Sequence, residues 1–338
     1  MCIRDSVHSK IEFELTQLIG ISGKKIHTAR SRNDQVLVNL HLYAKDEILD
    51  IKKLVKTLFE QFIKLSQQYK HVLLPGYTHM QVAMPSSFGL WFSAYAESLI
   101  DDLILMNAAF EISNQNPIDR KMTTELLGFK SLKINSIAAQ MSRGKLEKTI
   151  SFAIASVAST LAKFAMDVCL FMCQNFNFIG FPKELTTGSS IMPHKQNPDV
   201  FELMRAKCNK LQNLPTEIMM VLNNLTSGYH RDLQLLKENL MNGIDEIKDN
   251  LEVCHFMLQH IQVKENLLDD KIYDHLYSVE AVNKLVMAGV SFRDAYQKLG
   301  HEILANNFSP EKNIQHTHEG SIGNLCLDEI KEKFDAYY

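Results

Sequence analysis

The sequence is poor in the residues that interrupt helices. Its 338 residues include only 14 glycines and 8 prolines, whereas Leu, Ile, Lys, Glu, Ala and Met are frequent. This composition favours long helices. The 6 cysteines contain no Cys-x-x-Cys pair, so we interpret them as small packing residues in a reducing cytosol rather than as disulfides or a redox centre.

An excess of charge of one sign is also absent. The chain carries 36 Lys and Arg against 39 Asp and Glu, which gives a net charge of −3, and 46% of its residues are hydrophobic. This is the composition of an ordinary globular protein. Because there is no basic excess to contact phosphates, we expect no nucleic-acid partner.

No stretch resembles an export signal or a bilayer helix. The longest run without Asp, Glu, Lys or Arg, residues 71–96, contains Pro75, Pro85 and Gly76 together with several polar residues. A plain bilayer helix does not have this mixture. We therefore expect a cytoplasmic protein that does not bind membranes.

Motifs for common cofactors are missing too. The sequence has no Gly-x-Gly-x-x-Gly or Walker loop for nucleotide phosphates, and no His-Glu-x-x-His or Cys cluster for a catalytic metal. We expect no cofactor and no metal. The remaining chemistry is acid–base catalysis on a small anionic substrate.

Long segments without glycine or proline predict the architecture. Within 24–74, apolar residues such as Leu54, Leu58 and Phe62 recur at four-residue steps, which indicates an amphipathic helix. Further segments of this kind are 90–116, 145–179, 229–242 and 244–288. Helices this long need partners of similar length, and no sustained period-two alternation indicates a sheet. We predict an all-α fold, with a central bundle over 35–263 and a smaller helical domain over 264–338.

Residues 188–198, Gly-Ser-Ser-Ile-Met-Pro-His-Lys-Gln-Asn-Pro, form the most informative motif. Ser189 offers a hydroxyl, Lys195 a cation and Asn197 an amide, just before a helix start whose dipole favours anions. Together these groups suit a carboxylate that gains negative charge in a transition state. The alternative is a capped helix that begins near a proline, with no chemical role.

A second motif lies before the first long helix. Arg30 and Arg32 flank a serine and are followed by Asn33, so paired donors are available to hold a carboxylate. The alternative is that one of Ser31, Asn33 and Asp34 only caps the helix, which would not explain the two arginines.

Two further stretches carry polar groups of interest. His79 lies between Thr78 and Gln81 and is a candidate for proton transfer near neutral pH, although a loop histidine can also be purely structural. The second stretch is residues 227–234, in which Gln234 lies about one helical turn from Arg231 and Lys237, so that one face could present several donors. By itself this pattern is also typical of an exposed polar helix face.

These motifs resemble those of a known family. Residues 188–198 are similar to the signature loop of the fumarase/aspartase superfamily, whose members eliminate fumarate from succinyl compounds. Residues 28–36 and 76–81 narrow the resemblance to the argininosuccinate lyase family, and 228–237 resemble that family's substrate-binding helix. The resemblance runs from about Val7 to the C-terminal region.

The resemblance implies an all-α fold of the fumarase/aspartase type, a homotetramer with active sites shared between subunits, and cleavage of argininosuccinate to arginine and fumarate. By position, Ser189 matches the serine that removes the Cβ proton, and His79 matches the partner acid or base, with the order of the two left open. Glu202 matches the acid that pairs with this histidine. Lys195 and Asn197 match groups that stabilise the dianionic aci-carboxylate. The other predicted substrate-binding residues are Arg30, Arg32, Asn33, Thr78, Gln81, Tyr229, Gln234 and Lys237.

The chain departs from the family at two places. It begins close to the helix before the second motif, so we expect an N-terminally truncated relative in which 1–34 is a remnant of the N-terminal domain and its substrate loop. The junction of Asn116 and Pro117 skips a loop rich in glycine and serine. The alternatives that stay open are another fumarate-releasing lyase (adenylosuccinate lyase, fumarase or aspartase) and an inactive structural oligomer like the related lens crystallins.

Overall fold

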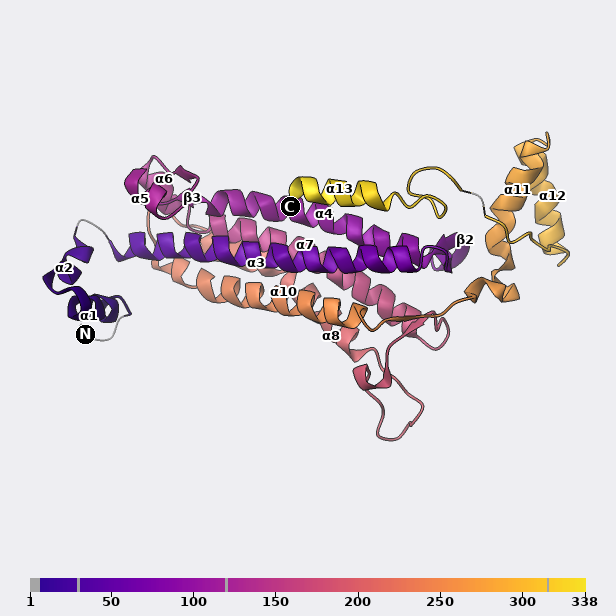
Figure 1. The fold of residues 1–338 in the computed structure, drawn as a ribbon, viewed down its shortest axis with the longest axis horizontal. Helices are drawn as coiled ribbons and strands as arrows, with labels where there is room; N and C mark the ends of the chain where they lie inside the picture. Colours follow the sequence, from indigo (N-terminus) through magenta and orange to yellow (C-terminus); the bar gives the residue numbers. More distant parts are fainter. Residues whose placement is uncertain (1–6, 29–30, 119–120, 315) are drawn as a thin grey trace. The chain divides into compact units, whose positions relative to one another are not determined.

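The computed structural model describes residues 7–28, 31–118, 121–314 and 316–338. Four long helices dominate it, namely α3 (Arg32–Gln68), α4 (Phe88–Ser113), α7 (Lys145–Met172) and α10 (Leu236–Leu258) (Figure 1). Over these residues the sheets are three two-stranded pairs only. The predicted all-α class is therefore confirmed.

The chain divides into two compact units, and each long helix contributes residues to both of them. Unit 1 comprises Met1–Asp50, Met106–Ala153 and Leu214–Ile244. Its other elements are α1 (Val7–Ile19), α2 (Ile21–Lys24), the 3-10 turn η2 (Lys25–His27), β3 (Gln115–Asn116), α5 (Lys121–Leu126), β4 (Ser131–Leu132), α6 (Ser136–Met141), α9 (Leu214–Leu222) and the 3-10 turn η4 (Arg231–Gln234). The two short strands β3 and β4 pair in parallel.

Unit 2 comprises Ile51–Leu105, Ile154–Asn213 and Asp245–Tyr338. Its other elements are β1 (Leu73–Thr78), β2 (Gln81–Ser87), β5 (Ile179–Gly180), η3 (Lys183–Leu185), α8 (Asp199–Leu211), β6 (Gln262–Val263), η5 (Leu267–Asp269), η6 (Lys271–Tyr277), α11 (Ser278–Met287), α12 (Phe292–Leu304) and α13 (Leu327–Tyr337). Both α11–α12 and α13 belong to this unit. The division predicted from the sequence, with boundaries at 34 and 263, stays a prediction.

The apolar stripe of α3 explains why this long helix is stable. Leu40, Leu58 and Phe62, which recur at helical spacing, are at most 4% exposed. Isolated helices gain little from propensity alone, so burial of such a stripe supplies most of the stability. The predicted helix over 24–74 is thereby confirmed, with its observed ends at Arg32 and Gln68.

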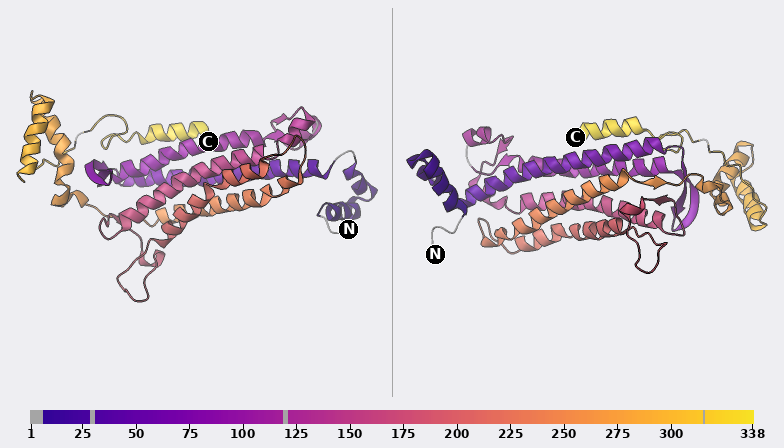
Figure 2. Two further views of the ribbon diagram at one scale, coloured as in Figure 1. Left: turned by 180° about the vertical axis from the view of Figure 1, so that it is seen from behind. Right: turned by 60° about the horizontal axis from the view of Figure 1, so that its bottom comes forward.

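Aromatic rings fill the core of unit 2. The ring of Phe62 on α3 lies 5.1 Å from that of Phe164 on α7 and 5.9 Å from that of Tyr95 on α4, centroid to centroid. Helix α13 runs beside α3 and α4 in all views, with Phe334 stacked on Phe59 at 3.9 Å (Figure 2). Interlocked rings of this size fix the helices that carry them against one another.

Two sequence expectations fail in detail. Residues 73–87, in which the sequence shows no sustained period-two alternation, form an antiparallel β1–β2 hairpin with a register shift between Pro75 and Tyr77. Two prolines and this shift hide the period-two alternation. The predicted helix break at Gly243 is also wrong, because α10 continues through it. A Cβ at this position would lie 2.5 Å from Leu214, so the glycine permits close packing of α10 on α9.

The predicted helix over 244–288 is wrong as one element. Helix α10 ends at Leu258, and β6 and two 3-10 turns follow before α11 begins at Ser278. Composition without glycine or proline permits a helix but does not require one. Here strand β6 pairs with β5 instead, Gln262 opposite Gly180.

One stretch passes a simple test for a membrane span. Residues Ser136–Met172 contain a window with a mean hydropathy of 1.6. Half of that window is buried inside the protein, however, as in the core helix of a globular protein. Length and composition are therefore weak evidence for a bilayer segment here.

A buried histidine in unit 1 predicts how stability depends on pH. His41 is fully buried, with Nδ1 3.0 Å from the carbonyl oxygen of Ser113. Burial, opposed by this hydrogen bond and assisted by nearby Lys133 and Arg143, lowers the pKa of His41 from 6.5 to about 4. The folded protein thus binds this proton more weakly than the unfolded chain does. Stability that is present above pH 6.5 is lost as the pH falls toward 4.

We expect His41→Asn to flatten this dependence, because asparagine can donate to the same carbonyl but does not titrate. Between pH 7 and pH 4 the unfolding free energy of the wild type should fall by about 3 kcal/mol more than that of His41→Asn. Urea unfolding of both proteins at a series of pH values measures it. Parallel curves for the two proteins would contradict the assignment.

Candidate active site

The loop between η3 and α8 extends away from the helices of its unit and carries the most informative motif (Figure 1). Its two ends are tied together by a bridge between Thr187 and Asn197, in which the amide of Asn197 donates to the carbonyl of Thr187 at 2.8 Å. The Asn197 side chain also donates to Oγ1 of Thr187, and Oδ1 of Asp199 accepts from the Thr187 amide. Asn197 therefore closes this loop, besides any contact it makes with a substrate.

The hydroxyl of Ser189 is held by backbone amides. Its Oγ accepts from the N–H groups of Ile191 at 3.3 Å and of Met192 at 3.2 Å. The proton of the hydroxyl is left free to be donated, and two N–H dipoles point at the oxygen where negative charge would develop if that proton left. This arrangement lowers the cost of an oxyanion at Ser189.

Two other predicted residues flank this serine. Lys195 lies on the same loop and is exposed, and its amide donates to the carbonyl of Met192 at 3.1 Å. Glu202 lies in the first turn of α8 and is exposed as well. The buried Phe201 beside it anchors the start of that helix. The loop thus exposes the ammonium group of Lys195, and the first turn of α8 exposes the carboxylate of Glu202.

The predicted histidine occupies the tip of the β1–β2 hairpin. Thr78 pairs with Gln81, so His79 and Met80 form a two-residue turn. Both turn residues have positive φ, 52° for His79 and 59° for Met80. Such a turn matches the twist of the strands but normally takes Asn and Gly, because side chains are strained in this region. The hairpin therefore holds His79 outward at the cost of backbone strain, which is a feature that accumulates at functional sites.

All three polar residues of the hairpin tip are exposed, namely Thr78, His79 and Gln81. Over the described residues, no hydrogen bond or ion pair joins this tip to Ser189, Lys195 or Glu202. Within this part of the chain the hairpin tip and the Ser189 loop are thus two separate exposed segments.

The start of α3 combines capping with possible binding. Ser31 caps the helix, since its Oγ accepts from the amide of Asn33 at 3.1 Å and its own amide donates to Oδ2 of Asp34 at 2.8 Å. This reciprocal pair is a capping box, so the capping alternative holds for Ser31 and Asp34. The side chains of Arg32 and Asn33 are left for other contacts. Arg30 lies outside the described residues.

The fourth motif spans η4 and the first turn of α10. Its chain turns at Gly228, where φ is 107°, and Nε2 of Gln234 then donates to the Tyr229 hydroxyl at 3.0 Å. Lys237 is the second residue of α10 and is partly exposed. The η4 turn breaks the continuous helix that the sequence indicates, so the three predicted contacts lie on a bend rather than on one helical face.

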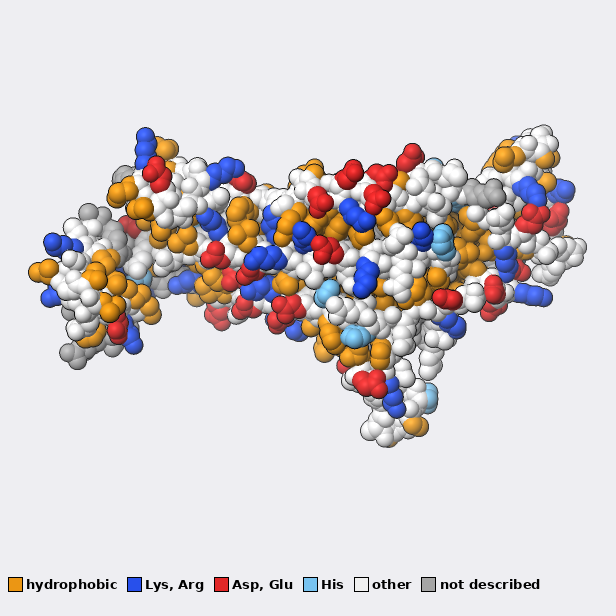
Figure 3. All heavy atoms as spheres, viewed as in Figure 1, with side chains coloured by type: hydrophobic (Ala, Val, Ile, Leu, Met, Phe, Trp, Pro, Cys, Tyr) orange, Lys and Arg blue, Asp and Glu red, His pale blue; other side chains and the backbone are white. Residues whose placement is uncertain are grey.

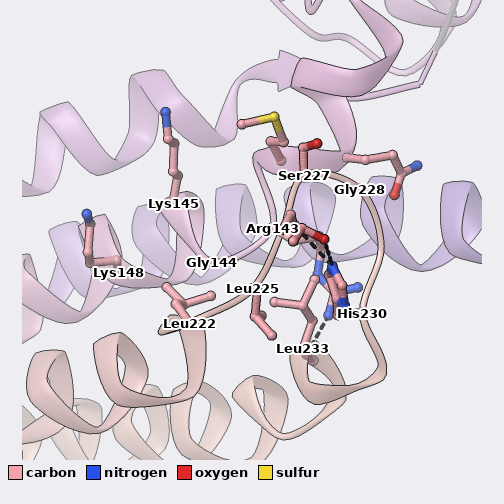
Figure 4. Close-up of a pocket in the computed structure, with 13 residues that line it drawn as sticks. Arg143, Gly144, Lys145, Lys148, Leu222, Leu225, Ser227, Gly228, His230 and Leu233 are labelled. Atoms are coloured by element: carbon pink, nitrogen blue, oxygen red, sulfur yellow. Dashed lines mark hydrogen bonds between the residues drawn. The ribbon is translucent and has the colours of Figure 1, made fainter.

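Unit 1 contains a cavity of about 220 Å³ beside the fourth motif (Figure 4). Gln140 lines this cavity, and its Nε2 donates to Oδ1 of Asp34 at the start of α3. Gly228 and His230 line the same cavity from the fourth motif. The fourth motif therefore contributes to the lining of the cavity, and Gln140 links that lining to the start of α3.

Sequence reasoning missed the residues behind this cavity. Arg143 and Glu147 lie at the junction of α6 and α7, with side chains 3% and 1% exposed, and form an ion pair. The i,i+4 spacing of opposite charges at the start of a helix was visible in the sequence, but such pairs are usually solvated. Only the fold places this one in the interior.

The chain is similar to curated lyases over most of its length. A protein-family profile described as Lyase matches residues 2–212. The argininosuccinate lyase of Parabacteroides distasonis is 56% identical, and that of Bacteroides fragilis 54%, each over 96% of this chain and 76% of the relative. The argininosuccinate lyase of Thermotoga neapolitana is 37% identical over 88% of this chain and 78% of its own length.

Solved structures of similar fold are more distant in sequence. A variant of EDDS lyase with bound fumarate has a TM-score of 0.79 at 18% identity and covers 96% of this chain and 74% of its own. A fumarate lyase:delta crystallin from Brucella melitensis has a TM-score of 0.71 at 17% identity, covering 86% of this chain and 69% of its own. These likenesses agree with the all-α fold described above.

The strain at the hairpin tip predicts a stabilising substitution. Met80→Gly should raise the unfolding free energy by about 1 kcal/mol, because glycine adopts positive φ without steric cost. Met80→Ala is the matched control, since it removes the same exposed side chain but keeps the unfavourable backbone angle. Urea unfolding of the three proteins measures the effect. Equal stabilities of the Gly and Ala variants would show that the turn is not strained.

Proposed function

Because the chain belongs to the argininosuccinate lyase family of the fumarase/aspartase superfamily, we propose that it cleaves L-argininosuccinate to L-arginine and fumarate, a step of arginine biosynthesis. Relatives of this name that are 56% and 54% identical over 96% of the chain carry the proposal. They do not favour adenylosuccinate lyase, fumarase, aspartase or an inactive structural oligomer.

The reaction is a β-elimination. A base removes a proton from the succinyl Cβ, and the electron pair moves onto the adjacent carboxylate as an aci-carboxylate. The pair then returns to form the double bond of fumarate while the C–N bond breaks, and an acid protonates the departing guanidino nitrogen. Proton transfer and charge stabilisation suffice for these steps.

We assign Ser189 and His79 to the two proton transfers. The amides of Ile191 and Met192 at the Ser189 oxygen stabilise an alkoxide. The hydroxyl proton leaves to solvent, and the alkoxide then takes up the Cβ proton as the base. His79 on the exposed hairpin tip is then the partner acid, and Glu202 is its acidic neighbour. The opposite order of base and acid remains chemically possible for the same two residues.

The aci-carboxylate needs fixed positive charge beside it. Lys195 on the loop of Ser189 supplies an ammonium group, and Asn197, which also closes that loop, supplies amide donors. The proposed contacts to the rest of the substrate come from the second and fourth motifs of unit 1 and from the hairpin. They are Arg30, Arg32, Asn33, Thr78, Gln81, Tyr229, Gln234 and Lys237.

We further propose a cytoplasmic homotetramer with active sites shared between subunits. The faces of the long helices support association, because large apolar side chains are exposed on them (Figure 3). Met166 on α7, Leu203 on α8, and Val253 and Phe256 on α10 are 41–62% exposed. Exposed apolar side chains at this density are typical of a surface that another chain covers. Charges of both signs are mixed over the face seen in Figure 3.

Turnover tests the catalytic assignment. Release of fumarate from argininosuccinate, followed by its ultraviolet absorbance, should fall by about 100-fold or more in Ser189→Ala, because no hydroxyl is left to exchange the Cβ proton. Ser190→Ala changes the neighbouring exposed serine and should keep most of the activity. Equal activities of the two variants would remove Ser189 from the mechanism.

Mixing inactive variants tests whether sites are shared. Ser189→Ala and Gln234→Ala should each be nearly inactive alone. When the two chains are co-expressed, sites that draw the serine and the glutamine from different subunits should recover about a quarter of the wild-type activity by random assembly. Mixed oligomers isolated with two affinity tags provide the sample. Mixed oligomers without recovered activity would place both residues of a site in one chain.

A further inference from the structure

A buried arginine contacts the backbone of the fourth motif. Nη2 of Arg143 donates to the carbonyl oxygen of Leu233 at 2.7 Å. That carbonyl belongs to the residue directly before Gln234, in the short turn that separates Tyr229 from Lys237. We propose that Arg143 is a positioning residue, which fixes the bend that carries these three substrate contacts. The proposal rests on the substrate role assigned above to that bend.

Glu147 makes this arginine possible in the interior. Its Oε1 lies 3.4 Å from Nε of Arg143, and its Oε2 accepts from the amide of Gly144 at 2.6 Å. A charged guanidinium buried without a partner would be strongly unfavourable, whereas this carboxylate compensates it and is itself held at the first turn of α7. The guanidinium is thus fixed in place before it reaches Leu233.

The guanidinium makes two different contacts. Its Nε lies in an ion pair with Glu147 without a hydrogen bond, and its Nη2 donates a hydrogen bond to the carbonyl of Leu233. The planar group holds the two directions at a constant angle, which a lysine ammonium on a flexible stem cannot reproduce. Arg143 therefore sets the distance between the start of α7 and the bend at η4.

Arg143 also lies near the start of α3. Arg143 and Gln140 line one cavity, and Gln140 donates to Asp34, whose carboxylate accepts from the amide of Ser31. Figure 4 shows the Arg143 side chain beside His230 and directed toward Leu233, while the ammonium ends of Lys145 and Lys148 point away from them. These lysines therefore do not connect Arg143 to the bend, and the position of the bend depends on Arg143.

Kinetics of Arg143→Lys test this role. The variant keeps a buried positive charge for Glu147 but lacks the planar group that donates to the carbonyl of Leu233. We expect the KM for argininosuccinate to rise about tenfold or more, the equivalent of one hydrogen bond to a charged group, with kcat changed less than about threefold. The split follows because the bend binds substrate, whereas Ser189 and His79 lie on other segments. An unchanged KM, or a loss confined to kcat, would overturn the proposal.

A double-mutant cycle separates positioning from general weakening of the fold. If Arg143 acts through the bend, Arg143→Lys should raise KM little in a Gln234→Ala background, because the contact that it positions is already lost. Additive effects on KM would overturn the proposal. Asp102→Asn is the control. Asp102 on α4 is buried and accepts from Ser156 and Thr160 on α7, away from the bend, so its substitution should leave KM unchanged.

Hydrogen exchange gives a readout that does not need turnover. The amides of Leu233 and Leu235 donate to His230 and Asp232 within the bend. They should exchange faster in Arg143→Lys than in the wild type, while the helix α8 shows no change. Unchanged exchange at the bend would overturn the proposal even if the wild type proved inactive on argininosuccinate, a result that would refute the proposed function alone.

A second variant keeps the test decisive if Arg143→Lys does not fold. Glu147→Gln retains an oxygen acceptor for Gly144 but removes the charge that holds the guanidinium. We expect the same rise in KM and the same faster exchange at the bend, both smaller than in Arg143→Lys. Full wild-type behaviour of this variant would show that the ion pair does not position the bend.

Discussion

The rest of this protein depends on the burial of apolar stripes along long helices. Helices of this length gain little stability on their own and are held because residues such as Leu58, Phe62 and Phe164 lock against one another. Within each unit, the same packing fixes the helical segments from which loops and turns leave, so polar side chains can be placed there with little additional structure.

Local hydrogen bonds then fix the loops and turns that leave the helices. The Ser189 loop is closed at its base by Thr187 and Asn197, and the start of α3 is closed by its capping box. The hairpin uses a strained two-residue turn to present His79 outward. In each case the backbone is satisfied within the segment, so that the functional side chains remain available to another molecule. This is the condition under which separate chains can complete one site.

Buried polar groups have a different role from the exposed ones. His41, Asp102 and the Arg143–Glu147 pair are all shielded from water and bonded to backbone or hydroxyl groups. Such groups add little net stability, because their desolvation offsets much of the attraction. They do restrict which geometry satisfies them. The polar interior of unit 1 therefore specifies where the η4 bend lies, while the apolar interior supplies the stability.

The sequence alone determined the helical class, most of α3, α4 and α7, and the residues of the four motifs, because helical periodicity and residue chemistry are local properties. It did not determine that Gly243 lies inside a helix or that residues 73–87 form a hairpin, since both depend on a neighbour that is distant in sequence. It also could not distinguish Arg143 and Glu147 from an ordinary solvated i,i+4 pair. Only the tertiary structure buries that pair and brings it to Leu233, because burial and long-range contact are properties of the whole fold.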